Sequence, residues 1–344
     1  MERVALIEHV RQVLARAGFA VSERCDLRPV SFDLVARRDK DLLIVKVLGN
    51  VDALAEPTAQ EMKVLCKFLH GRPVLVGLRS GTGILEEGVV YARHDIPIVH
   101  PATLEEYILG GQPPMVFAAP GGFYVRMDTS ALRQVRQELA ISLGTLAQIA
   151  GVSRRAIQMY EEGMSASIDA AMRLEEYLET DLIQPVDPFA SFDRDAYQPP
   201  PPAPEPEGQP DADPMEALVL RLLKDLGYQV HATKRSPFNA LTTEQGRATS
   251  GTPAASGPDP SAMLTGLGRD SPQLRRRARI VASVSGIVER PGFFVLERTN
   301  HTNVEGMPVV SRTELRRLTD PERILELILE RQGAGREAAA DGSA

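Results

Sequence analysis

The sequence predicts a multidomain protein in which two α/β domains flank an all-α helical bundle. Three observations support this. A length of 344 residues corresponds to two or three domains at about 100 to 200 residues each. Mixed strand and helix patterns over residues 1–125 give way to helical patterns alone over residues 126–186. A Pro-rich linker, residues 187–214, is followed by a renewed α/β pattern over residues 215–332.

Residues 1–125 combine amphipathic helices with short apolar strands. Apolar residues at helical spacing predict a helix over residues 2–17, and Gly18 follows it as a stop signal. The remaining pattern predicts strands at 19–21, 32–36 and 42–48, a helix at 57–69, a strand at 74–78, a helical segment at 84–91, a strand at 96–99 and a helix at 101–109. The order is α-β-β-β-α-β followed by α-β-α.

An aspartate and a lysine fall on the second and third predicted strands. The segment FDLVARRDKDLLIVKVLG, which contains Asp33 and Lys46, resembles the core of the restriction-endonuclease-like PD-(D/E)xK superfamily. This resemblance implies that Asp33 is a metal-binding acid and Lys46 the catalytic lysine. Such an enzyme needs two carboxylates on Mg²⁺, and the second acid belongs two residues before the lysine. That residue is Ile44, so we expect an inactive domain, and a protein that is not an enzyme.

Two other interpretations of these residues stay open. Glu61 or Glu8 could supply the missing acid, which would make the protein a Mg²⁺-dependent endonuclease or repair nuclease targeted by its central domain. Alternatively, Lys46 is a strand-end lysine that reaches toward solvent and Asp33 is a solvated acid near a turn.

The central bundle carries the most specific motif. Four short helical segments lie between residues 130 and 183, and no strand is expected among them. Ala147, Gly151, Val152 and Ile157 have the spacing of a helix-turn-helix, and Ser153 suits the N-cap of its second helix. The segment LRQVRQELAISLGTLAQIAGVSRRAIQMYEEG resembles the Cro-like (Xre) helix-turn-helix family, including its ending Tyr160-Glu161-x-Gly163.

This resemblance implies a DNA-reading second helix. Its N-terminal side chains Ser153, Arg154, Arg155 and Gln158 would face the major groove, where Arg pairs with guanine and Gln with adenine. Arg133 and Arg136 could gather on the same side as further DNA-binding residues. Many family members have a phosphate-contacting Gln in the first turn of the preceding helix, whereas this chain has Leu143, so we expect that contact to be missing.

The C-terminal α/β domain could be a diverged repeat of the first. ALIEHVRQVLARAGFAV matches EALVLRLLKDLGYQV, and HDIPIVHPATLEEYI matches EGMPVVSRTELRRL around Pro97 and Pro308. The alignment places Asn239 on Asp33 and Thr265 on Lys46, so the second copy lacks both site residues. The cluster Arg275–Arg279 is either a phosphate-contacting helix or a solvated helix face. We expect residues 245–261 to be a flexible insertion and residues 333–344 a disordered tail.

Composition excludes several classes. The six His and two Cys residues lack metal-ligand spacing, so no metal site or other cofactor is expected, and Cys25 and Cys66 are expected to be buried. No apolar run is long enough for a membrane span and no secretory signal is present, which indicates a cytoplasmic protein. A net charge of −7 indicates that any nucleic-acid contact is focal.

The domain order and length resemble the archaeal family of HTH-type transcriptional regulatory proteins. This resemblance implies a sequence-specific double-stranded DNA-binding regulator without enzymatic activity. A homodimer is expected, because one recognition helix reads only a few base pairs. An effector or a component of the transcription machinery stays open as a further partner. The alternatives are the targeted nuclease and a protein-interaction scaffold that uses the bundle only for protein contacts.

Overall fold

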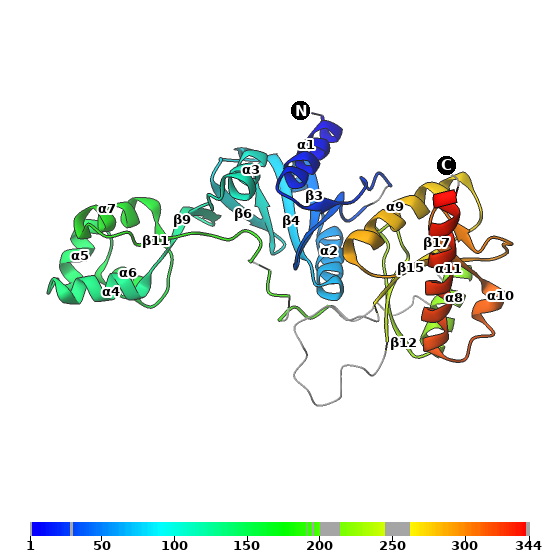
Figure 1. The fold of residues 1–344 in the computed structure, drawn as a ribbon. Helices are drawn as coiled ribbons and strands as arrows, with labels where there is room; N and C mark the ends of the chain where they lie inside the picture. Colours follow the sequence, from blue (N-terminus) through cyan, green and yellow to red (C-terminus); the bar gives the residue numbers. More distant parts are fainter. Residues whose placement is uncertain are drawn as a thin grey trace. The chain divides into compact units, whose positions relative to one another are not determined.

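The computed structural model describes residues 2–27, 30–190, 192–194, 196–199, 214–244 and 262–341 (Figure 1). The chain forms two compact units. The first contains Met1–Ala17, Val47–Leu54 and Val74–Phe192, and the second contains Gly18–Lys46, Ala55–Pro73 and Asp193–Ala344. In this described part of the chain, no helix has the length and apolar character needed to cross a membrane.

The N-terminal α/β elements follow the predicted order with one exception. They are α1 (Arg3–Arg16), β1 (Ala20–Val21), β2 (Leu34–Arg38), β3 (Asp41–Asn50), the short 3-10 helix η1 (Val51–Ala53), α2 (Glu56–Leu69), β4 (Arg72–Ser80), β5 (Gly83–Ile84), β6 (Val89–Arg93), β7 (Ile96–Val99) and α3 (Pro101–Gly110). The exception is residues 84–91, where the predicted helix is wrong and the chain forms β5 and β6 instead. Because His94 and Asp95 both have positive φ, they make a tight turn that pairs β6 with β7 as a hairpin.

The strands of this region hydrogen-bond in the order β1-β2-β3-β4-β7-β6. β2 runs antiparallel to β3, with Leu34 opposite Val45, and β4 runs parallel to β7. β3 is buried over six consecutive residues from Leu42 to Val47, as expected for a strand covered on both faces. The predicted run of apolar residues is therefore a central strand of the sheet.

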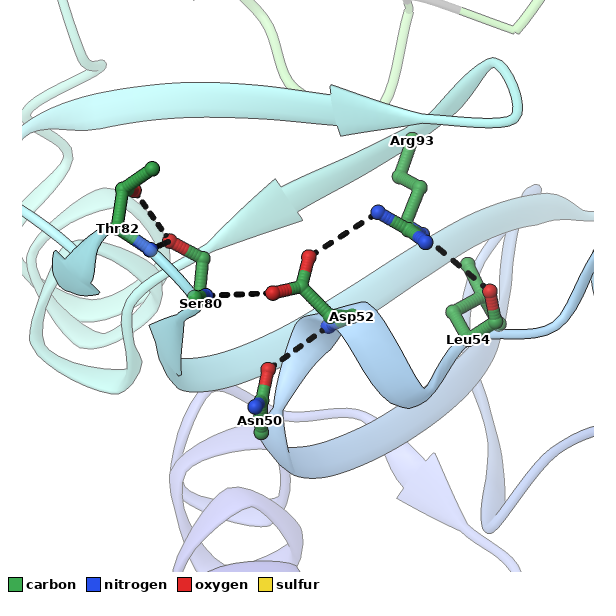
Figure 2. Close-up of polar contacts among 7 residues, drawn as sticks. Asn50, Asp52, Leu54, Ser80, Thr82 and Arg93 are labelled. Carbon is green, nitrogen blue, oxygen red and sulfur yellow. Dashed lines mark hydrogen bonds and ion pairs between the residues drawn. The ribbon is translucent and has the colours of Figure 1, made fainter.

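An aspartate fastens three segments of the first unit, as Figure 2 shows. Asp52 lies in η1, and its carboxylate accepts hydrogen bonds from the Gly81 amide at 2.5 Å and from Arg93 Nη1 at 3.0 Å. Arg93 Nε also donates to the Leu54 carbonyl at 3.3 Å, and the Asn50 side chain caps the Asp52 amide at 2.9 Å. The network therefore ties the segment after β3 to the end of β4 and to the end of β6.

The helix-turn-helix bundle is preceded in the chain by a β-hairpin that the sequence pattern did not indicate. Strands β8 (Val116–Ala119) and β9 (Gly122–Met127) pair across Pro120 and Gly121, so β9 crosses the predicted boundary after residue 125. Four helices follow in Figure 1: α4 (Thr129–Glu138), α5 (Leu143–Ala150), α6 (Arg154–Glu161) and α7 (Ile168–Leu178). Two short strands also pair with β9, which corrects the expectation of helices alone: β10 (Ala166–Ser167) and β11 (Ile183–Gln184).

The C-terminal α/β elements all lie in the second unit. They are α8 (Pro214–Asp225), β12 (Tyr228–Ala232), β13 (Ala240–Glu244), β14 (Met263–Gly268), α9 (Pro272–Val288), β15 (Gly292–Leu296), β16 (Asn303–Val304), β17 (Met307–Ser311), α10 (Arg312–Leu315) and α11 (Pro321–Asp341). Their sheet order is β12-β13-β14-β15-β17-β16. This order corresponds to β1-β2-β3-β4-β7-β6 in the N-terminal region. In both regions a helix connects the third strand to the fourth: α2 in the first and α9 in the second.

Three sequence expectations concern the connecting segments. The insertion at 245–261 and most of the Pro-rich linker lie outside the described residues. Within the predicted linker, the Tyr197 hydroxyl donates to Gln60 Oε1 at 3.1 Å, so this residue lies against α2. The predicted disordered tail is wrong as far as Asp341, because α11 continues through residues 333–341. The Ala-rich run near its end has high helix propensity.

Candidate functional site

The helix-turn-helix is formed by two capped helices, α5 and α6. The Ser142 hydroxyl accepts a hydrogen bond from the Thr145 amide at 3.1 Å at the start of α5. The Ser153 hydroxyl does the same for the Ala156 amide, also at 3.1 Å, at the start of α6. Each cap satisfies one of the amides that have no partner within the helix. The predicted N-cap role of Ser153 is confirmed.

The turn between the helices depends on the predicted small residues. Gly151 ends α5 in the left-handed conformation, with φ 69°, where a side chain is disfavoured. The next amide, of Val152, donates back to the Ala147 carbonyl at 3.0 Å. Ala147 is 6% exposed and Ile157 is fully buried, so the two helices meet closely. These residues form one core with α7, which fixes the direction in which α6 projects.

One face of α6 is exposed at its N-terminal end. All four residues predicted to read DNA are exposed: Ser153, Arg154, Arg155 and Gln158. Gln158 Nε2 donates to Glu162 Oε1 at 3.2 Å on the helix surface. Within the described chain, the two arginines make no ion pair or hydrogen bond. The structure thus presents two free guanidinium groups and an amide side by side along the first turns of α6.

Arg136 and Arg133 contact the same buried residue at the other end of α6. The Glu161 side chain is only 7% exposed, and it receives two hydrogen bonds from Arg136: Nε to Oε1 at 2.5 Å and Nη2 to Oε2 at 3.1 Å. This contact raises the pKa of the Arg136 guanidinium. Arg133 is half exposed and donates from Nη2 to the Glu161 carbonyl at 2.8 Å. The prediction that both arginines contact DNA does not distinguish their roles, and the structural role of Glu161 in the Tyr160-Glu161-x-Gly163 ending was not predicted.

Further polar contacts fasten the bundle to β9 and β11. The Glu175 carboxylate of α7 accepts from the Leu182 and Ile183 amides, both at 2.7 Å. Asp128 caps α4, and hydrogen bonds from the Ala131 amide and the Ser130 hydroxyl lower the pKa of its carboxyl group. The bundle is therefore anchored at the entry to α4 and at the exit from α7.

Asp33 and Lys46 are brought together as the resemblance implied. Lys46 Nζ lies 3.7 Å from Asp33 Oδ2, and it donates to the Val30 carbonyl at 2.7 Å. The Asp33 side chain is fully buried and that of Lys46 is 7% exposed. The interpretation of these residues as a solvated acid and an exposed strand-end lysine is therefore wrong. Asp33 directly precedes β2 and lies opposite Lys46 of the antiparallel strand β3, so both side chains are on the same face of the sheet.

The other residues around this pair do not fit a divalent cation. Ile44, at the expected position of the second acid, is fully buried. Glu61 accepts hydrogen bonds at 3.0 Å from the Lys234 and Arg235 amides and at 2.6 Å from the Ser236 hydroxyl, so its carboxylate is occupied. Among the described residues, no three His, Cys, Asp or Glu side chains gather around a common point. Mg²⁺ needs several oxygen ligands, and the described residues gather no such cluster.

The C-terminal sheet has a glycine at the position equivalent to Lys46. Thr265 pairs with Ala240, just as Val45 pairs with Leu34, so the strand register places Gly266 on Lys46. The sequence alignment that placed Thr265 on Lys46 is therefore wrong by one residue. In a weak repeat, sequence similarity alone does not fix the register of a strand to a single residue.

Arg277 of α9 fills this second site, and the prediction did not anticipate it. Its guanidinium donates to the Asn239 side chain at 2.5 Å, to the Leu267 carbonyl at 3.0 Å and to the Pro237 carbonyl. Burial lowers its pKa. Arg277 therefore does not belong to a solvated helix face, although its neighbours Arg275, Arg276 and Arg279 remain exposed.

Two family models match the chain on the elements described above. A PD-(D/E)XK superfamily domain matches residues 3–114, and a helix-turn-helix matches residues 132–183. The matched fold and the capped helix pair define a helix-turn-helix protein of the Cro-like type that carries a nuclease-like domain. No solved structure matches the chain.

Curated relatives are similar over nearly the whole chain. A protein of Halorubrum lacusprofundi is 41% identical over 98% of this chain and 100% of its own length, and one of Methanococcoides burtonii is 39% identical over 96% and 98%. A protein of Halobacterium salinarum is 40% identical over 96% and 98%. Each bears the name "Putative HTH-type transcriptional regulatory protein". The chain belongs to this archaeal family.

Proposed function

We propose that this protein is a transcriptional regulator that binds specific double-stranded DNA sites through the N-terminal end of α6. The observation that carries the proposal is the exposed row formed by Ser153, Arg154, Arg155 and Gln158 on a helix whose opposite face is buried. A recognition helix presents this end to the edges of the base pairs in the major groove. The names of the relatives support a role in transcription.

Each exposed side chain has a role that its chemistry supports. Arg154 and Arg155 can each make two hydrogen bonds to the O6 and N7 atoms of guanine, and Gln158 can pair with adenine. Ser153 is the N-cap and lies where a hydroxyl can reach a base edge or a phosphate.

The two arginines of α4 take different roles in this proposal. Arg133 is half exposed and contacts a phosphate. Arg136 is occupied by Glu161, so we assign it the positioning of α6 rather than a DNA contact. The Leu143 side chain in the first turn of α5 offers no hydrogen bond to a phosphate, so Arg133 supplies relatively more of the affinity for the DNA backbone.

We further propose that the regulator acts as a homodimer. One α6 helix reads only a few base pairs, whereas a two-fold dimer reads two half-sites about 34 to 36 Å apart. The expected operator is therefore an inverted repeat. Sequence specificity of the order needed in a genome requires this additional contact.

Capture of genomic fragments by the purified full-length protein tests the proposal. The experiment is run at about 150 mM salt, because nonspecific binding falls steeply with salt, and in parallel with and without Mg²⁺. Enrichment of a two-fold-symmetric sequence with intact ends is the expected result. Capture without any shared sequence would contradict it, and no capture at all would favour a protein-interaction scaffold.

A nuclease is the second candidate, and the 3.7 Å approach of Lys46 to Asp33 in a PD-(D/E)XK domain favours it. The absence of a second acid at Ile44 argues against it. The Mg²⁺ arm of the same experiment separates the two functions, because cut ends that disappear in Asp33→Asn would establish cleavage. Loss of binding in Arg154→Ala with no effect of Asp33→Asn would establish the regulator alone.

A further inference from the structure

The second compact unit contains residues from both α/β folds of the chain. It joins Gly18–Lys46 and Ala55–Pro73 of the first fold to all of the C-terminal fold. The strands of the two folds match in order and direction: β1-β2-β3 and β12-β13-β14 are antiparallel, and β4-β7 and β15-β17 are parallel.

Backbone hydrogen bonds align the two folds residue by residue. The Asp33 amide donates to the Val45 carbonyl at 2.8 Å, and the Asn239 amide donates to the Thr265 carbonyl at the same distance. The Asp33 carbonyl accepts from the Cys25 amide at 2.9 Å, just as the Asn239 carbonyl accepts from the Thr233 amide at 2.7 Å. Asn239 therefore stands in the place of Asp33.

The two tight turns and the two long helices match as well. His94 and Asp95 have positive φ before Pro97, as Glu305 and Gly306 do before Pro308. Helices α2 and α9 both carry a proline in the first turn, Pro57 and Pro272, which gives a common starting point for aligning them.

In this alignment, contacts of α2 have counterparts among the contacts of α9. The Glu61 carboxylate of α2 accepts from the Lys234 amide at 3.0 Å. The residue aligned with Glu61 is Arg276, which forms an ion pair with Asp26, the residue aligned with Lys234. Glu61 binds the backbone amide of Lys234, whereas Arg276 binds the Asp26 carboxylate, so each contact joins a charged helix side chain to the aligned loop position. If the two folds were paired without symmetry, the two contacts would have no reason to use aligned residues. A pairing with approximate two-fold symmetry explains why they do.

A second set of contacts follows the same relationship. Phe68 of α2 stacks on His231 with ring centroids 3.8 Å apart. The aligned residues are Ser283 of α9 and Glu23, and the Glu23 amide donates to the Ser283 hydroxyl at 2.7 Å. Arg37 extends this side of the interface, because its Nε and Nη2 atoms donate to the Ile287 and Val288 carbonyls at 2.6 and 3.0 Å.

We propose that residues 214–332 are a second copy of the nuclease-like fold, and that its loop 234–236 is the built-in partner of the surface formed by Ser31 and Glu61 in the first copy. Glu61 holds two amides and one hydroxyl of this loop. The Ser31 amide donates to the Arg235 carbonyl at 2.5 Å, and the Ser31 hydroxyl lies 3.3 Å from that of Ser236.

The pairing reaches the Asp33 strand and the buried lysine. Val30 accepts the hydrogen bond from Lys46 through its carbonyl, and the next residue, Ser31, is bonded to the loop. The loop therefore fixes the segment that holds the Lys46 ammonium group. In the second copy the same place is filled by its own Arg277, so that copy serves as a protein partner rather than as a second site.

Disulfide trapping in the full-length protein tests the pairing. In the double variant Ser31→Cys with Ser236→Cys, we expect an intramolecular disulfide to form in air at low protein concentration, detected as a mass loss of one hydrogen pair and a shift on a non-reducing gel. The native cysteines do not compete, because Cys66 is buried and burial raises the pKa of Cys25 to about 12. The control pair is Ser31→Cys with Thr313→Cys, which places the second thiol at an exposed position on α10.

A third substitution separates the pairing from a chance approach of two loops. Adding Glu61→Ala to the trapping pair removes the acceptor of three hydrogen bonds, and disulfide formation should slow by about tenfold or more. Adding Glu61→Gln keeps one acceptor oxygen and should give an intermediate rate. The proposal is overturned if the folded trapping pair forms its disulfide no faster than the control pair, or if Glu61→Ala leaves the rate unchanged. This result is independent of DNA binding by α6.

Discussion

Glu161 of α6 and Arg136 of α4 form a two-point ion pair inside the helix-turn-helix bundle, with donor–acceptor distances of 2.5 and 3.1 Å. Glu161 is the last residue of α6, so the pair sets the position of that helix against α4. The exposed end of α6 is thereby placed by a contact at its buried end.

Breaking this pair should destabilise the bundle strongly. Arg136→Ala leaves the Glu161 carboxylate buried without its main partner, and we expect the free energy of unfolding to fall by about 3 kcal/mol. Chemical denaturation followed by circular dichroism measures the change. Arg133→Ala is the matched control from the same helix, and its effect should stay below about 1 kcal/mol because that side chain is half exposed. Equal losses for the two variants would refute the positioning role.

Substitutions on α6 should separate base reading from phosphate contact. Arg154→Ala should weaken binding to the operator by about 1 to 3 kcal/mol, or roughly 5- to 150-fold, with little effect on an unrelated sequence. Arg133→Ala should weaken binding to both DNAs alike and reduce the salt dependence by about one phosphate contact. Fluorescence anisotropy over a range of salt concentrations measures both quantities. An unchanged operator affinity in Arg154→Ala would remove this residue from the interface.

The turn glycine offers a test with an internal control. Gly151→Ala places a side chain at φ 69° and 2.6 Å from Arg173 Nη1, so we expect a loss of about 1 to 2 kcal/mol in stability. Gly144 lies inside α5, where its added Cβ would meet only the Ser142 hydroxyl at 3.6 Å. Gly144→Ala should therefore stabilise the helix by up to about 1 kcal/mol. Thermal unfolding of both variants checks these opposite signs.

The second nuclease-like copy should not accept a side chain at the position of the lysine. A Cβ on Gly266 would lie 2.4 Å from the Phe294 ring, so Gly266→Ala should destabilise the protein by about 1 to 3 kcal/mol. Gly286 of α9 has open space around it, and Gly286→Ala should be neutral or stabilising. Denaturant titration of the two variants gives the comparison, and similar stabilities would contradict the close packing of β14 on β15.

Acid should weaken the contact between α10 and α11. Burial raises the pKa of Glu314, but hydrogen bonds from Arg331 and from Ser311 outweigh it and hold the pKa at about 2. A lowered pKa in the folded state means that this contribution is fully present above the unfolded value of roughly 4.3 and is lost as the pH falls toward 2. The stability difference between the native protein and Glu314→Gln should therefore be largest near neutral pH and shrink below about pH 4. A constant difference across this range would exclude the linkage.

The sequence by itself determined the features that depend on local pattern. Apolar spacing located most of the helices and the central strands, and the order of small, glycine and serine residues from Ala147 to Ser153 specified the helix-turn-helix. These features follow from backbone preferences and side-chain periodicity within a few turns of chain. Asp33 and Lys46 could be placed on neighbouring strands for the same reason.

Only the tertiary structure decided which polar groups form hydrogen bonds or ion pairs with residues distant in the sequence. Nothing local in the sequence distinguishes Arg136, bound to Glu161, from the free Arg154, or Arg277, buried beside Asn239, from the exposed Arg276. The pairing of Glu61 with loop 234–236 spans more than 170 residues. A buried charge must find a partner wherever the fold supplies one, and that partner is set by packing between elements rather than by the residues next to it in the chain.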